Sequence, residues 1–249
     1  MAVSVALFGD PGCPWGYSAD RCEAALRWRY GDQLDWELVM IGLAEDGSQY
    51  TDRGYTPEMM AGFLPQFSAA FGMPFSYEPK DHVAATSPAC RAVVAAGLQG
   101  GTAAALEAFR ALQFMQFTTA GTLDNVDDIR AALEGLEVMD AEAVVGAIDS
   151  PEVVEAYEAG RMRARQAAGG PAEALGKTSA TDWPVRYTAP TMVFTGPDDR
   201  VCEAALRWLK GDQLEWELVM IGLAEHGSPN TDRGYTPEMM AGVLPQFSA

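Results

Sequence analysis

The sequence has few of the residues that metal sites, hydrolases and nucleic-acid-binding surfaces require. Only two histidines, His82 and His226, occur in 249 residues, and neither stands at a metal-ligand spacing, so we expect no bound metal. The G-x-S-x-G turn of a Ser-His-Asp hydrolase is absent. The 17 basic residues face 35 acidic ones, a formal charge of -18, and such a surface repels phosphate backbones and anionic lipids. We therefore predict no nucleic-acid and no membrane partner.

Cysteine is also scarce. Cys13, Cys22, Cys90 and Cys202 are too few and too scattered for the disulfide framework of a secreted domain, and no two of them have zinc-finger spacing. The first ten residues lack the basic, apolar and cleavage regions of a signal peptide, and no apolar run reaches 18 residues. We therefore expect a soluble cytoplasmic protein, long enough to bury a full core.

The N-terminal third has the pattern of a β-α-β unit. Residues 3–8, VSVALF, form a short run rich in β-branched and aromatic residues that ends at Gly-Asp-Pro-Gly, which is typical of a strand followed by a turn. Pro14 suits the first position of a helix, and apolar residues then recur at helical spacing to about residue 30. The apolar run 34–44 predicts a second strand, parallel to the first.

The middle of the chain has a different character. Between about residues 51 and 180 we find no strand pattern, and we predict helices at 56–72, 88–98, 102–117, 126–136 and 150–168. The aromatic and methionine stripe in this region is interpreted as core: Phe109, Leu112, Phe114, Met115 and Phe117. Residues 187–196 return to strand composition, with Pro190 where a strand tolerates proline. The predicted divisions are 1–48 and 181–200 for the α/β part and 49–180 for a helical insertion.

The last block, 201–249, is a near-copy of residues 21–69. Between 22–69 and 202–249, 41 of 48 positions are identical. The Cys-Pro-Trp turn is not repeated, which excludes a second catalytic centre in the copy. Near-identical segments compete for one structural position, so exchange between protomers is a route to a homodimer. The other interpretation is a recent duplication, or an error of sequence assembly that replaced the native C-terminus.

Two short stretches, in this order around a helical region, resemble a known family. They are Asp10, Pro11, Cys13, Pro14, Trp15 and Tyr17 at the front and Thr188, Ala189, Pro190 and Thr191 at the back. This arrangement resembles the DsbA-like, FrnE-type branch of the thioredoxin superfamily, related to kappa-class glutathione transferases and 2-hydroxychromene-2-carboxylate isomerases. The resemblance implies an α/β fold: a thioredoxin-like sheet with a large all-helical insertion, followed here by an atypical duplicated C-terminal segment.

The resemblance also assigns roles. Cys13 takes the position of the nucleophile, Pro190 that of a cis-proline whose loop faces the cysteine, and Thr188 and Ala189 lend backbone groups to a substrate or thiol. A cysteine at a helix N-terminus has a pKa of about 3.5–7.5 instead of about 8.5, so we expect a reachable, partly ionised sulfur. Gly16 stands where a C-x-x-C pair has its second cysteine.

With one sulfur, Cys13 needs an external thiol to release a mixed disulfide. We therefore predict a monothiol oxidoreductase without a bound cofactor, which uses a glutathione- or mycothiol-type thiol as cosubstrate. Gly16 would leave room beside the sulfur, and Pro14, Trp15 and Tyr17 would line the cleft. Two alternatives stay open: a thiol-dependent isomerase or transferase, and an inactive binding module, which a buried Cys13 would favour. Cys22, Cys90 and Cys202 are interpreted as small core residues.

Overall fold

The computed structural model describes residues 3–169, 171–174, 178–180 and 185–195; the repeated block 201–249 lies outside them. Three strands form one sheet in the order β2-β1-β5. Strand β1 (Val3–Gly9) pairs in parallel with β2 (Leu34–Met40) and antiparallel with β5 (Thr191–Thr195). The predicted β-α-β unit is therefore confirmed, and β5 brings residues from near position 190 beside the N-terminal strand.

Both predicted strands at the sheet edges are shorter than expected. Strand β2 ends at Met40 and not at residue 44. The N–H of Ile41 still donates to the Gly9 carbonyl of β1 (2.9 Å), but Gly42 then turns the chain away at φ 65°. The segment 187–196 is split at the cis peptide between Ala189 and Pro190. Before it, β4 (Arg186–Tyr187) pairs with β3 (Thr178–Ser179), a short strand in the region where we predicted none.

Helix α1 (Pro14–Tyr30) connects β1 to β2. Pro14 occupies its first position, as predicted, and Gly31 ends it at φ 47°. The predicted buried face is wrong in one respect: Cys22 is exposed, and its neighbour Glu23 is buried. Successive residues of a helix point about 100° apart. A buried face that is rotated relative to the predicted one therefore covers Glu23 and leaves Cys22 exposed.

The insertion is helical in the structure. The two predicted helices, 88–98 and 102–117, are the two parts of α4 (Ser87–Thr118), and a kink at the non-helical Gly101 (φ 74°) separates them. The helices are α2 (Ser48–Thr51), α3 (Pro57–Phe71), α4 (Ser87–Thr118), α5 (Val126–Leu133), α6 (Ala141–Ala147), α7 (Pro151–Ala164) and α8 (Pro171–Ala174). Side chains of Thr56, Asn125, Asp140 and Ser150 accept hydrogen bonds from the first turns of α3, α5, α6 and α7, which explains why these helices begin where they do.

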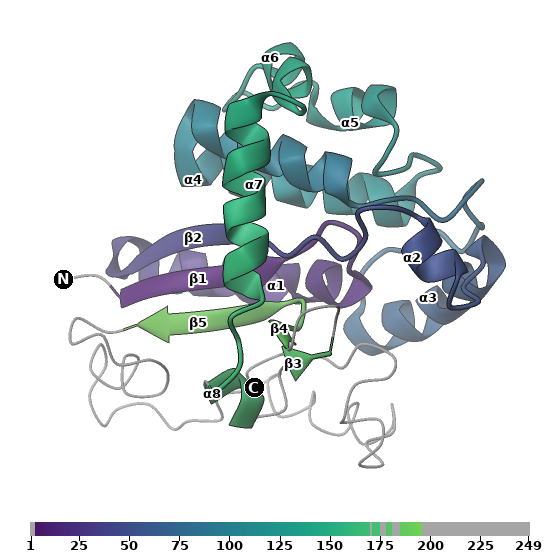
Figure 1. Ribbon diagram of the computed structural model, residues 1–249, viewed down its shortest axis with the longest axis horizontal. Coiled ribbons are helices and arrows are strands. Elements are labelled where there is room, and N and C mark those ends of the chain that lie inside the picture. Colours follow the sequence, from purple (N-terminus) through teal and green to yellow (C-terminus); the bar gives the residue numbers. More distant parts are fainter. Residues whose placement is uncertain (1–2, 170, 175–177, 181–184, 196–249) are drawn as a thin grey trace.

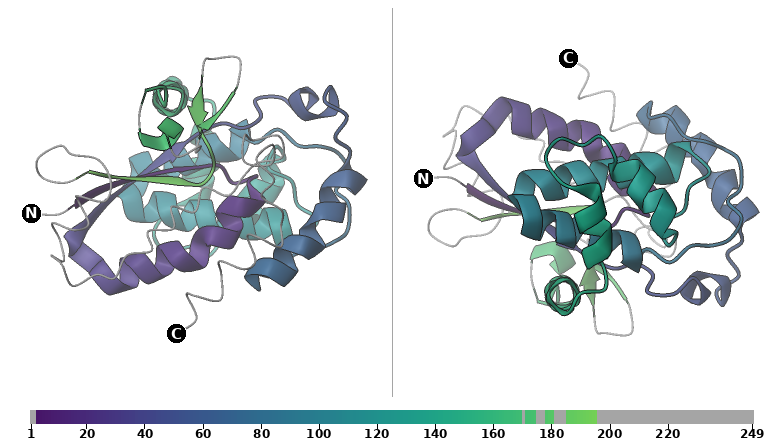
Figure 2. Two further views of the ribbon diagram at one scale, coloured as in Figure 1. Left: turned by 90° about the horizontal axis from the view of Figure 1, so that it is seen from below. Right: turned by 90° about the horizontal axis from the view of Figure 1, so that it is seen from above.

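The sheet lies between helices. In Figure 1, α1 is behind the sheet and α7 in front of it, and the view from below in Figure 2 agrees. Helix α4 is long and apolar enough to cross a membrane by length and composition, but it packs against α1, β2 and α5–α7. Its residues Phe109, Leu112, Met115 and Phe117 are buried as predicted, whereas Phe114 is exposed. Helix α4 is therefore a core helix of this fold.

Candidate functional site around Cys13

Cys13 lies at the junction between the β1–α1 turn and helix α1. It is the N-cap residue, with extended backbone (φ -88°, ψ 112°), and its side chain makes no capping hydrogen bond. Its N–H donates to the carbonyl of Asp10 at 3.1 Å, and its own carbonyl accepts from Tyr17 at 3.0 Å, so the turn and the helix hold its backbone on both sides. The first turn of α1 contains no acidic residue. The free N–H groups of this turn therefore favour a negative charge at Cys13.

The structure brings Cys13 to the Pro190 loop, 176 residues further along the chain. The Cys13 Sγ donates a hydrogen bond to the Ala189 carbonyl at 3.1 Å. The following peptide, Ala189–Pro190, is cis. Thr191 donates from its Oγ1 to the Thr188 carbonyl at 2.7 Å, which closes the loop on itself. The predicted site residues from both ends of the sequence are thus neighbours, because β1 and β5 pair antiparallel.

The expected exposure of the sulfur is wrong for this conformation. Cys13 is 1% exposed and belongs to an apolar cluster that residues of β1, β2, α7 and the Pro190 loop form. Its members are Ala6, Phe8, Val39, Ile41, Ala164 and Ala189, with Trp15 and Tyr187 packed against them. The sequence pattern predicted that Cys13 stands at the start of a helix, but not which residues would cover its sulfur. The inserted helix α7 returns over the sheet and closes this side.

Gly16 is buried, and its missing side chain would stand between Cys13 and Gln113. An ideal Cβ built on Gly16 would lie 3.6 Å from the Cβ of Cys13 and 3.2 Å from Nε2 of Gln113 on α4. Disulfide-linked cysteines have Cβ atoms about 3.5–4.5 Å apart. Position 16 is therefore placed as the second position of a dithiol pair, and Gln113 reaches toward the place where that thiol would be.

Trp15 and Tyr17 belong to a group of packed aromatic rings rather than to the two walls of an open cleft. The half-buried Trp15 meets Phe67 of α3 edge-on, with ring centroids 4.4 Å apart. Tyr17 is 3% exposed, stacks on Phe117 of α4 at 5.1 Å, and donates its hydroxyl to the Pro74 carbonyl at 3.1 Å. The prediction that Tyr17 lines a cleft is corrected: its ring anchors α1 to α4 and to the segment after α3.

A buried carboxyl in the β1–α1 turn has a larger role than the sequence indicated. Asp10 is fully buried, and its carboxyl oxygens accept from Gly12 N (2.8 Å), Leu43 N (2.7 Å) and the Thr86 hydroxyl (2.9 Å). Burial raises the pKa of this carboxyl, and these hydrogen bonds oppose the shift. Cys90 lies within 3.4 Å of the same carboxyl, and burial raises the pKa of the Cys90 thiol. Asp10 thus fastens the turn before Cys13 to the segment after β2 and to the start of α4.

Helix α1 carries two more buried polar groups. Asp20 pairs with Arg110 of α4 at 3.4 Å. Glu23, 4% exposed, has one carboxyl oxygen without a hydrogen-bond partner. Burial first, and then the charge of Asp20, raises the pKa of Glu23 to about 8. The apolar periodicity of α1 gave no sign of these residues.

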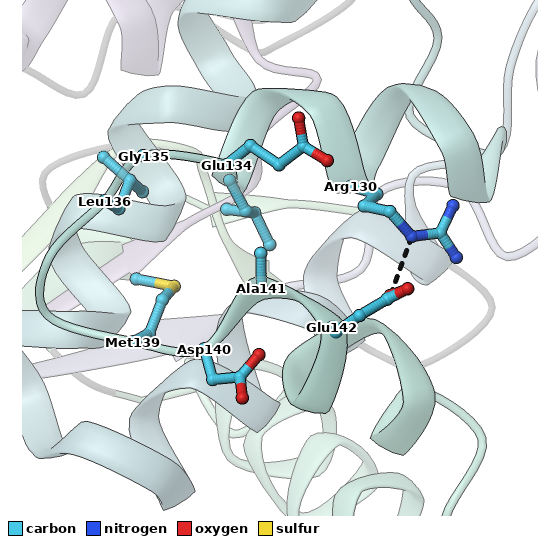
Figure 3. Close-up of a pocket in the computed structure, with 9 residues that line it drawn as sticks. Arg130, Glu134, Gly135, Leu136, Met139, Asp140, Ala141 and Glu142 are labelled. Carbon is cyan, nitrogen blue, oxygen red and sulfur yellow. Dashed lines mark hydrogen bonds and ion pairs between the residues drawn. The ribbon is translucent and has the colours of Figure 1, made fainter.

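The pocket in Figure 3 lies elsewhere, in the helical layer. Its volume is about 320 Å³, and Arg130, Leu133, Met139 and Glu142 are among the residues from α5, α6 and their connection that line it. It contains none of the predicted site residues. Within the described ranges, no three His, Cys, Asp or Glu side chains come together as a metal site. Among the described residues, the predicted site residues from the two ends of the sequence meet around Cys13 and not at this pocket.

Comparisons with known proteins agree on the fold. No family model matches the chain, and no curated protein does. Among solved structures, a protein provisionally described as a protein disulfide isomerase from Nitrosomonas europaea aligns at a TM-score of 0.60 and 19% identity, over 84% of this chain and 96% of its own. The cytosolic disulfide reductase DsbM from Pseudomonas aeruginosa aligns at 0.55 and 20%, over 80% and 87%, and its structure with GSH at 0.53 and 19%, over 82% and 91%. The chain has the thioredoxin-like fold with a helical insertion that these DsbA-like structures share.

Proposed function

We propose that this protein is a thiol–disulfide oxidoreductase that works with a single sulfur, that of Cys13. The observation that carries the proposal is the position of this sulfur: it lies at the N-terminus of α1 and within 3.1 Å of the carbonyl that precedes the cis Pro190. Backbone donors at the helix start stabilise a thiolate, which is the nucleophile in exchange reactions. The structures of DsbM and its complex with GSH support the choice of a small thiol as partner.

The proposed cycle has two exchange steps. In the first, the Cys13 thiolate attacks a mixed disulfide between a substrate and a small thiol at the sulfur of the small thiol, and the substrate leaves as a thiolate. In the second, a free small-thiol anion attacks the same small-thiol sulfur on Cys13, so that a small-molecule disulfide leaves and the Cys13 thiolate returns. Overall, the mixed disulfide is reduced to the substrate thiolate, and one free small thiol is consumed to form the small-molecule disulfide. Gly16 provides no sulfur, so the second step needs an external thiol, of a glutathione or mycothiol type.

Access to the sulfur is part of the proposal. Trp15 packs on the apolar cluster around Cys13 and meets Phe67 and Phe71 of α3 edge-on. We propose that a movement of Trp15 with α3 opens the site to a small disulfide. Cytoplasmic location, and a homodimer through exchange of the repeated block, stay predictions that the described residues do not address.

The buried sulfur also favours a second candidate function. A thioredoxin-like domain whose Cys13 never reaches solvent would act as a binding module, and its 1% exposure is the observation in favour of it. A thiol-dependent isomerase or transferase is the third candidate, in which Cys13 sits beside a bound thiol without forming a disulfide. These candidates differ in one measurable property, the formation of a covalent adduct at Cys13.

The test is an intact-mass measurement after incubation with oxidised glutathione. Cys22 is exposed and would react on its own, and Cys202 lies outside the described residues, so both are replaced by serine in the test protein. Cys13 and the buried Cys90 remain. We expect one glutathione adduct, mapped to Cys13, absent after Cys13→Ser, and removed by reduced glutathione.

Each other outcome decides between the candidates. A folded test protein without an adduct, tried also with a mycothiol-type disulfide, refutes the redox proposal. Slow alkylation of Cys13 in that same protein, at the rate of Cys90, would then support the binding module. Normal alkylation without a disulfide adduct would support the isomerase or transferase.

A further inference from the structure

A buried amide group lies beside Gly16. Gln113 of α4 is 1% exposed, and its Nε2 has no hydrogen-bond partner. This atom and the Cβ of Cys13 lie 3.2 Å and 3.6 Å from the ideal Cβ position of Gly16, so both border one small space. A buried donor without a partner destabilises the folded protein, so its presence indicates that another state of the site uses it.

The two protonation states of Cys13 need different partners. In this conformation the sulfur donates to the Ala189 carbonyl, as only a protonated thiol can. After ionisation the sulfur has no proton to donate, and the partial negative charge of the carbonyl oxygen repels it. The thiolate must then turn away from Ala189 toward donors, and the space beside Gly16 offers one in Gln113.

We propose that the Gln113 amide donates a hydrogen bond to the Cys13 thiolate in the space beside Gly16, and so holds the nucleophile in its reactive position. The inference rests on the proposed function, because it gives the thiolate of that cycle its partner. In the resting protein the sulfur stays on the Ala189 carbonyl; when the proton leaves to solvent, the sulfur rotates about its Cα–Cβ bond and meets Gln113. A Cβ at position 16 would stand between the sulfur and the amide. The proposed contact therefore needs both glycine at position 16 and glutamine at position 113.

Titratable groups on the neighbouring elements must be held constant in the test. They lie on the turn before α1, the loop after β2, α4, the end of α7 and β4: Asp10, Glu45, Cys90, Arg165, Arg186 and Tyr187. None of them is changed in the variants below. A difference between the variants and the parent protein therefore reports on position 113.

The experiment measures the alkylation rate of Cys13 against pH in the Cys22→Ser, Cys202→Ser protein, with mass spectrometry to count Cys13 alone. Gln113→Met keeps the size and removes the donor; we expect the midpoint of the rate profile to rise by about one pH unit, because hydrogen bonds to charged groups are among the stronger ones. Gln113→Glu keeps size and polarity and places an acceptor there, so the rise is larger. Gln116→Met is the matched control: it has a buried side-chain oxygen without a partner three residues away on α4, and its midpoint should equal that of the parent.

The outcomes separate this inference from the proposed function. Thermal unfolding first shows which variants are folded, and at least one of the two Gln113 variants suffices. A parent protein that forms the Cys13 adduct while the Gln113 variants keep its midpoint overturns the role of Gln113 and leaves the function standing. A parent protein without any adduct overturns the function itself. Equal rises in the Gln113 and Gln116 variants also overturn the inference, since they would report a general loosening of α4.

Discussion

Replacing Gly16 by cysteine should convert the single-sulfur site into a dithiol site. The ideal Cβ of residue 16 lies 3.6 Å from that of Cys13, within the range of about 3.5–4.5 Å that disulfides need. A loop of four residues stabilises the oxidised form by about 2 kcal/mol in the chain-entropy model. Replacing a glycine within a helix stabilises the folded protein by about 0.5–1 kcal/mol. The 3.2 Å contact between the new Cβ and Gln113 Nε2 opposes this gain until the flexible amide moves aside.

The assay is intact-mass analysis in the Cys22→Ser, Cys202→Ser background after equilibration with oxidised and reduced glutathione. Gly16→Cys should lose two hydrogens and carry no glutathione, and proteolysis should map the new disulfide to Cys13 and the substituted position. Gly16→Ser has nearly the same size and should keep the glutathione adduct on Cys13. A folded Gly16→Cys protein that retains this adduct as fully as Gly16→Ser would refute the placement of residue 16 as the second thiol position.

Three further changes test the surroundings of Cys13. Trp15→Ala should speed the alkylation of Cys13 about tenfold or more at fixed pH, since it removes the contact to Phe67, while Cys90 stays slow; equal rates would mean that Trp15 is no cover. Asp10→Asn should lower the free energy of unfolding by about 1–3 kcal/mol in urea titrations, because its NH2 group must face a backbone N–H that now donates to Asp10. Glu23→Gln should raise the melting temperature at pH 8 but not at pH 4: the folded pKa of about 8 exceeds the unfolded 4.5, so the folded state binds more protons between these values and loses stability as pH rises through them. A melting temperature difference independent of pH would contradict the last reasoning.

The parts of the site that depend on local signals could be predicted from the sequence. Gly-Asp-Pro-Gly ends a strand, Pro14 starts a helix and Pro190 precedes a strand, each through backbone restrictions that act within a few residues. The right-handed β-α-β connection then follows from chain geometry. The approach of Cys13 to Ala189 could be expected only from the resemblance to a family, since no local pattern links residues 176 positions apart.

The parts that depend on tertiary packing could not be predicted. Glu23 replaces Cys22 on the buried face of α1 because α3 and α4 decide which side of the helix is covered. Asp10 looked like an ordinary turn residue, yet its partners Leu43 and Thr86 come from distant segments. Gln113 lies within an apolar stripe of the sequence. Its amide is recognised as part of the site only because the structure places it beside Gly16, which has no Cβ. Each of these polar groups is buried by elements that lie far away in the sequence.

The burial of Cys13 changes what controls its reactivity. A charge in an apolar cluster costs several kcal/mol unless hydrogen-bond donors compensate it. A path from solvent is therefore not enough to make this sulfur a good nucleophile, because its thiolate also needs donors. In the reactive state that we propose, donors reach the thiolate from two directions, the free N–H groups at the start of α1 and the amide of Gln113. Apolar walls from Phe8, Val39 and Ile41 leave the sulfur little room beside them. A thiolate held in this way reacts with disulfides small enough to pass Trp15, which is why we place the selectivity of the proposed reaction in the size of the disulfide rather than in its charge.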